Sequence, residues 1–300
     1  MPDLNVTARR LASLIEPIVG QVYFSPECHA EYEVLGFDPS PGKAGDVALP
    51  DGPAYFTSRG SLMGQVPGEV VAAAFSVFNP AVVVPHVLLG WSRTDAATIC
   101  AARTRGAVAQ LARILGERPD GIDRAGELLA RAASPLRPEG RPLFAGALAS
   151  GYPGTPLGDM WHAGDLLREY RGDCHTAAWV SAGLTAVEIG LLTELYWGLP
   201  KRSYIRTRAW TDADLDSATA SLIAKGYVDV TATEMTTEGG AAREAIEEVT
   251  DAQMAPAIDA LGGDADELFS IIEPWGAAVR AAGGYLASGP HDLARRAGAR

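Results

Sequence analysis

Apolar residues recur at helical spacing along most of the chain, and this pattern predicts a mainly α-helical protein. In the first half it covers residues 7–19, 94–115 and 122–133. A further helix is expected after Pro67, because the first turn of a helix accepts proline. Residues 54–64 are punctuated by glycine, so we expect them to be short and extended.

The second half continues the helical pattern and adds one predicted hairpin. A helix from Gly158 is expected to end at a turn over 171–175, and a second helix then reaches Ala182. Thr185 and Glu188 have the spacing of a capping box, which marks another helix start. The remaining expected elements are a helix over 211–225, strands over 227–232 and 234–237, and long helices over 238–261 and 266–282.

Prolines and glycines concentrate between Ser134 and Leu157, which predicts a boundary. We therefore expect a helical N-terminal domain over 1–134, a connection over 135–157 and a C-terminal domain over 158–300. The predicted order in the last part is several helices, a two-stranded wing and a long helix. This is the order of a winged helix-turn-helix domain, and its long helices offer a surface for a homodimer.

The C-terminal half resembles MarR-type regulators. Leu222–Asp229, followed by Met235–Glu247, looks like the third helix, the wing and the dimer-side helix of that family. More broadly, the chain resembles an actinobacterial family of helix-turn-helix domain proteins with no assigned reaction, through the stretches Pro26–His29, Tyr55–Arg59, Gly140–Leu143, Leu167–His175 and Glu248–Asp251. The resemblance implies the fold, a helical N-terminal region joined to a winged helix, and implies no activity.

Composition narrows the classes of partner. The 300 residues are 47% hydrophobic, which is enough to build a core, and the formal net charge is −12. That charge argues against anionic membrane surfaces, and no run of about 18 apolar residues predicts a membrane span. The N-terminus lacks a signal-peptide pattern, so we expect a cytoplasmic protein. Three widely spaced cysteines without a CxxC predict neither disulfides nor a zinc knuckle.

Charge also argues against DNA binding by the predicted winged helix. Residues 211–250 hold nine acidic side chains against Lys225 and Arg243, a net charge of −7. Nucleic-acid affinity comes mainly from Lys and Arg, so such a surface repels a duplex. The cations just before it, Lys201, Arg202, Arg206 and Arg208, are the only opposing signal.

Residues 161–175 concentrate the candidate chemistry. With His175 at the start of a helix, the helix dipole favours its neutral form, and Asp173 can orient it as a general base. The alternative is that Asp173 only caps the helix and His175 is a satisfied interior residue. His162, Asp165 and Glu169 share one helix face, which is either a divalent-metal site or an ordinary solvated polar face.

Other side chains complete a predicted small-molecule site. Arg59 lies among apolar neighbours and can hold an anionic or carbonyl group of a ligand, or pair with a protein carboxylate. We assign Arg171 the same ligand-holding role. His29, Glu169 and Trp179 are expected to complete the substrate contacts.

The favoured function is a cofactor-independent acid/base enzyme of specialised metabolism, a lyase, isomerase or cyclase, in which His175 and Asp173 move a proton. One alternative is a ligand-responsive winged-helix transcription regulator. A haem- or metal-binding protein, with His175 or His29 as the axial haem ligand, is a second alternative, and nucleic acid and membranes are not expected partners.

Overall fold

The computed structural model describes residues 3–232 and 234–286. Its elements are almost all helical, as the apolar pattern predicts. They are α1 Leu4–Val19, η1 Gly20–Tyr23, α2 Pro26–Val34, β1 Lys43–Ala44, β2 Val47–Ala48, α3 Gly52–Gly60, η2 Ser61–Met63, α4 Gly68–Phe75, α5 Pro80–Arg93, α6 Ala96–Leu115, α7 Ile122–Ala133, α8 Pro142–Ser150, α9 Pro156–Ser181, α10 Ala186–Trp197, η3 Ile205–Arg208, α11 Asp212–Ala224, α12 Thr237–Gln253, α13 Ala255–Leu261, η4 Gly262–Asp264 and α14 Ala265–Ala281.

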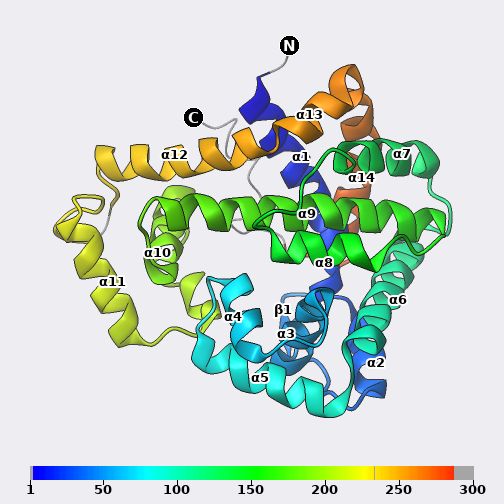
Figure 1. The fold of residues 1–300 in the computed structure, drawn as a ribbon, viewed down its shortest axis with the longest axis horizontal. Coiled ribbons are helices and arrows are strands. Elements are labelled where there is room, and N and C mark those ends of the chain that lie inside the picture. Colours follow the sequence, from blue (N-terminus) through cyan, green and yellow to red (C-terminus); the bar gives the residue numbers. More distant parts are fainter. Residues whose placement is uncertain (1–2, 233, 287–300) are drawn as a thin grey trace.

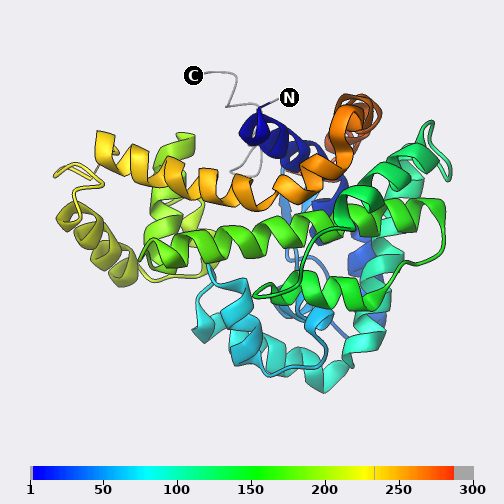
Figure 2. The same cartoon turned by 45° about the horizontal axis from the view of Figure 1, so that its top comes forward.

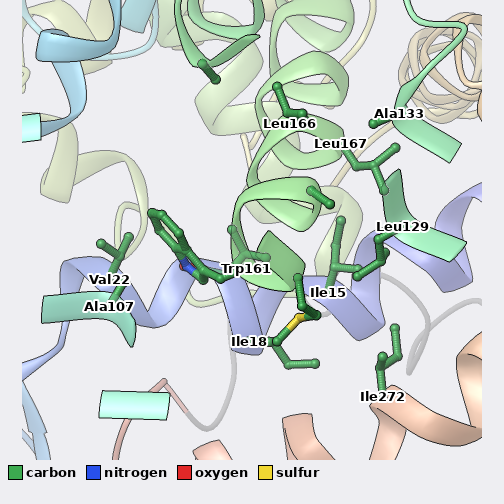
Figure 3. Packing of buried hydrophobic residues seen from close by; sticks show 14 of the residues in the cluster. Ile15, Ile18, Val22, Ala107, Leu129, Ala133, Trp161, Leu166, Leu167 and Ile272 are labelled. Atoms are coloured by element: carbon green, nitrogen blue, oxygen red, sulfur yellow. The ribbon is translucent and has the colours of Figure 1, made fainter. Parts of the chain in front are cut away.

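Helix α9 is the central element, and Figure 1 shows it running across the molecule with the other helices packed around it. It begins at Thr155, whose hydroxyl accepts the Gly158 N–H, and Pro156 fills the first turn. Trp161, Leu166 and Leu167 are buried in the main core (Figure 3). Helices α1, α7, α8 and α12 pack against its length, so α9 can be stable only as part of the folded whole.

The predicted turn over 171–175 is wrong, because α9 continues through it without a break to Ser181. Gly172 is exposed there, and no atom lies within 4 Å of where a β-carbon would be. One glycine costs a helix only about 1 kcal/mol relative to alanine. Burial of Tyr170, Cys174 and Ala178 on the other faces outweighs that cost.

Two further predictions about local structure need correction. Residues 54–64 form helix α3 and the turn η2, because the Asp51 side chain caps Ala54 N–H and Pro53 stands in the first turn. The helix expected over 238–261 is two helices, α12 and α13, which meet at Met254 just before Pro256. The long helix α6 is capped by Asp95, one residue after the start expected at 94.

The segment 186–236 forms an outlying module of α10, α11 and a short turn (Figure 2). Both helices start with reciprocal capping boxes, Thr185 with Glu188 and Thr211 with Asp214. After α11 an isolated antiparallel bridge pairs Val228 with Met235. Leu191, Leu192, Leu215 and Leu222 build a separate small core here, and the C-terminal turn of α9 joins it through Ala178 and Trp179.

The loop between α10 and α11 is held from inside by one carboxylate. Glu194 is buried and accepts the backbone N–H groups of Arg202, Tyr204 and Ile205 at 2.6, 2.7 and 2.8 Å. The Pro/Gly-rich segment 135–157 contains α8, which packs on α9. The three-part division into domains stays a prediction.

Among the described residues, no helix taken singly has the length and apolarity to cross a membrane. Helices α9 and α10 meet that test only together, across a 107° bend.

Two glycines on long helices should respond oppositely to alanine. At Gly106 of α6 a β-carbon would lie 2.5 Å from Cys28 Cα, so Gly106→Ala forces α2 and α6 apart and should lower the free energy of unfolding by about 1–3 kcal/mol. Gly172→Ala meets nothing and should raise it by about 0.5–1 kcal/mol. Urea denaturation of both variants tests the packing. A gain in stability for Gly106→Ala contradicts it.

Candidate functional site

Helix α9 turns a polar stripe toward the interior of the protein. His162, Asp165, Glu169 and Asp173 recur every three or four residues and therefore share a face. All four are buried, because α1, α6 and α8 cover this side of α9. The interpretation of this stripe as an ordinary solvated face is therefore wrong.

The first two carboxylates of the stripe are held by arginines from other helices. Arg103 of α6 donates two hydrogen bonds to Asp165, at 2.8 and 3.0 Å, and each side chain of this pair is 1% exposed. Arg59 of α3 donates two to Glu169, at 3.1 and 2.7 Å. With both carboxylates engaged, they do not form a metal site with His162. No other group of three or more metal-binding side chains occurs in the residues that the structure describes.

Glu169 lies within a larger buried network, which we call the inner cluster: Glu16, Tyr23, Arg59, Arg168, Glu169 and Tyr285. Arg168 bridges Glu169 and Glu16, and the Tyr23 hydroxyl donates to Glu169. Burial opposes ionisation of Glu169, but Arg59 and Arg168 outweigh it and hold its pKa at about 2. Burial raises the pKa of Tyr23 to about 12. Near neutral pH Glu169 is therefore ionised and Tyr23 keeps its proton.

A second network, the junction cluster, connects α1, α9 and α12 beside the outlying module. It comprises Arg9, Arg171, His175, Arg243, Glu244, Glu247 and Asp251. Arg171 donates to Glu247 and Asp251 at 2.9 and 3.1 Å, and Arg9 reaches Asp251 and Glu244 at 2.6 and 2.7 Å. Burial opposes ionisation of Glu247, but Arg243 and Arg171 outweigh burial and hold the pKa of Glu247 well below its ordinary value.

Asp173 and His175 do not form the expected pair. They are two residues apart within one helix and so point to different sides. Asp173 accepts the N–H groups of Leu143 and Phe144, both at 3.0 Å, and thereby caps α8. His175 Nδ1 lies 3.2 Å from Thr250 Oγ1 in the junction cluster. The prediction that Asp173 orients His175 is therefore wrong. A catalytic role for either residue stays a prediction.

The remaining predicted ligand contacts are distributed over the protein. Arg59 and Arg171 pair with protein carboxylates, which is the alternative that the sequence left open for Arg59. His29 is buried on α2, where Nε2 faces the Tyr23 carbonyl at 3.2 Å and burial lowers its pKa. Trp179 is buried in the core of the outlying module. The structure therefore does not assemble the seven predicted site residues into one pocket.

The loop before α11 is attached to the N-terminal half through contacts that the sequence did not indicate. We call these contacts the seam. Trp210 Nε1 donates to the Val77 carbonyl at 2.8 Å, and Asn79 N and Nδ2 donate to the carbonyls of Arg208 and Ala209 at 2.9 and 3.0 Å. The Arg208 guanidinium lies 4.5 Å from the centre of the Phe78 ring. No local pattern in the sequence indicates that Asn79 and Trp210 have these distant partners.

Comparison with family models gives one match, to a helix-turn-helix family, over residues 8–286. The chain belongs to this helix-turn-helix family. No curated protein and no solved structure gives a significant match. The match spans both the N-terminal helices and the outlying module.

In this helix-turn-helix protein, the exposed face of α11 is small and acidic. It carries Asp212, Ala213, Asp216, Ser217, Ala220 and Ala224. The nearby cations are largely neutralised within the protein. Arg206 pairs with Asp212 at 2.7 Å, Arg202 pairs with Asp216, and Lys225 pairs with the buried Glu188 at 2.7 Å. Among the described residues, Lys201 has no carboxylate partner.

Removal of one member of the buried Arg103–Asp165 pair should be strongly destabilising. Arg103→Met leaves an uncompensated carboxylate in the core and should lower the free energy of unfolding by about 3–5 kcal/mol. The double variant Arg103→Met, Asp165→Leu removes both charges and should regain most of that loss. Thermal and urea denaturation measure both. If the double variant is no more stable than the single one, the pairing is not the cause.

Asp173 should make stability fall as pH rises. Burial raises its pKa to about 7, whereas an unfolded aspartate has a pKa of about 4, so between these values the folded state binds the extra proton. Asp173→Asn keeps an acceptor for the α8 N–H groups and cannot titrate. Relative to the natural protein it should gain on the order of 3 kcal/mol between pH 5 and pH 8. A stability difference that does not change over this range contradicts the assignment.

Proposed function

We propose that this helix-turn-helix protein is a transcription regulator that contacts DNA through α11 and the turn carrying Val228 and Met235. The observation that carries the proposal is the family match over residues 8–286, together with the place of α11 at the edge of the molecule. Figure 1 shows α11 on the side opposite α6 and α7, where its outer face is open. A cytoplasmic location and a homodimer stay predictions of this account.

The arrangement of the module supports a winged-helix assignment. Helix α10 packs on α11, the Val228–Met235 bridge follows α11, and α12 leads back along the body. This is the order of supporting helix, recognition helix, wing and connecting helix in regulators of this kind. The small side chains Ala213, Ser217 and Ala220 on the outer face allow close approach to a groove.

Electrostatics restrict how such a module can bind DNA. Lys201, Arg202, Arg206 and Arg208 are the cations before α11, and Arg202 and Arg206 are paired with its aspartates. A DNA phosphate can replace Asp212 or Asp216 as the partner of these arginines. With at most four phosphate contacts in each module, non-specific affinity is low, and the affinity of one module should fall with salt with a logarithmic slope no steeper than about −4.

The acid/base enzyme that the sequence favoured has less support than the regulator. An enzyme of that kind needs a general base beside an open pocket. Asp173 and His175 are not paired, and the pKa of Glu169 is too low for it to accept a proton. Two hollows among the described residues, one beside His29 and one beside Glu194, each have room for about one water molecule.

DNA binding can be tested by changing the charge of α11. The double variant Asp212→Asn, Asp216→Asn releases Arg202 and Arg206 from their internal partners. It should bind the DNA upstream of its own gene at least about tenfold more tightly than the natural protein at 50 mM salt, with a steeper salt dependence. Fluorescence anisotropy of labelled duplex, measured at several salt concentrations, gives both quantities.

A matched control removes the same charge elsewhere. Asp259→Asn with Asp266→Asn alters exposed residues of α13 and α14 and should leave DNA affinity within about twofold. Equal gains for both double variants would mean that only net charge matters. Absence of binding by the natural protein and by both variants at 50 mM salt would sink the proposal.

A further inference from the structure

We infer that Ser76 and the seam form a strained latch that sets the position of α11 relative to the helical body. The latch itself needs no DNA. Its regulatory meaning rests on the proposed function, since α11 is the helix assigned to macromolecular contact. The inference is carried by backbone strain at Ser76, by hydrogen bonds across the seam and by aromatic packing behind it.

The strain lies in one residue at the end of α4. Ser76 has φ 45° and ψ −50°, a combination that residues with a β-carbon rarely adopt. The Val77 N–H donates to the Phe75 carbonyl at 2.5 Å, so residues 75–77 close a γ-turn with positive φ at its centre, the rare and strained form. Such strain persists only where the surroundings impose it, and it concentrates at switch regions.

The surroundings that impose it are the contacts of the seam. Directly after Ser76, the Val77 carbonyl accepts from Trp210 and Asn79 donates twice to residues 208 and 209. The Ser76 hydroxyl itself lies 3.2 Å from the Thr176 hydroxyl of α9. Ala209, at the α11 side, also has a positive φ, of 61°. Both sides of the seam are therefore held in unfavourable backbone conformations while it is closed.

Behind the turn, aromatic rings connect the seam to the body. The Tyr55 ring of α3 packs against Phe75 and Phe78, at centroid distances of 6.2 and 5.7 Å. Arg59, which holds Glu169 of the inner cluster, lies 4.7 Å from the centre of the Phe75 ring. The Phe78 ring in turn packs against the guanidinium of Arg208, three residues before Thr211. A shift of α3 therefore acts on Phe75, the first residue of the strained turn, and on Phe78, directly after it.

This arrangement gives the latch two states. In the closed state the seam bonds fix Trp210, which directly precedes Thr211, the cap of α11. In the open state those bonds are broken, Ser76 relaxes to an ordinary backbone conformation, and α11 is free to move. The strain raises the free energy of the closed state. The difference in free energy between the two states is therefore smaller than the hydrogen bonds alone would make it.

Hydrogen exchange of the whole protein tests the latch without DNA. Ser76→Gly removes the steric cost of the positive φ and favours the closed state. In conditions where local opening dominates, the amides of residues 205–216 should therefore exchange at least about fivefold more slowly. Trp210→Phe keeps a ring but removes the bond to Val77, and the same amides should then exchange roughly fivefold faster.

Two controls separate the latch from general stabilisation. Ala232→Gly relieves a positive φ of 56° in the turn after α11, away from the seam, and should leave exchange of residues 205–216 unchanged. Ser76→Ala keeps the strain and loses only the contact with Thr176, so it should not slow exchange. If Ser76→Gly leaves these amides unchanged, or slows them no more than Ala232→Gly does, the latch is overturned. The DNA-binding proposal would be unaffected by that result.

Discussion

The fold depends on burying the charged stripe of α9. Asp165, Glu169 and Asp173 lie on a helix that passes through the core, and an unpaired buried carboxylate there costs several kcal/mol. Each is satisfied by a segment distant in sequence: Arg103 from α6, Arg59 from α3 and the N-terminus of α8. These three contacts fix where α3, α6 and α8 lie, since a carboxylate without its partner would disfavour the folded state. The charges thus specify the arrangement of a core whose apolar packing supplies most of the stabilisation.

The same helix connects the two cores of the protein. Its first turns lie in the main core and its last turn, through Trp179, lies in the core of the outlying module. The junction cluster and the seam hold that module from two sides: Tyr196 of α10 donates to Glu244 of α12, and Trp210 donates to the α4–α5 connection. The position of α11 is therefore a property of the whole chain, which agrees with a family match that extends over both parts.

Local signals predicted local structure well. The capping box predicted at Thr185 and the helix start predicted at Thr211 mark the true starts of α10 and α11, because such caps depend only on residues three apart. The turn predicted at Gly172 failed because the favourable burial of its neighbours comes from other helices. Likewise the sequence offered Arg59 and Arg171 as ligand contacts, but their carboxylate partners lie more than seventy residues away. Such pairings, and the strained turn at Ser76, have no signal in the spacing of nearby residues.

The regulator role requires that the outlying module, which carries α11, contacts DNA at discrete sites. It is tested most directly by chromatin immunoprecipitation of the tagged protein from its own cells, with sequencing of the recovered DNA. A small set of sites that share a sequence pattern should be enriched. This enrichment should be lost when Ala213 and Ser217 on the outer face of α11 are replaced by bulky residues in a protein that still folds. Recovery of no enriched site, or of the same sites with the altered α11, would contradict it.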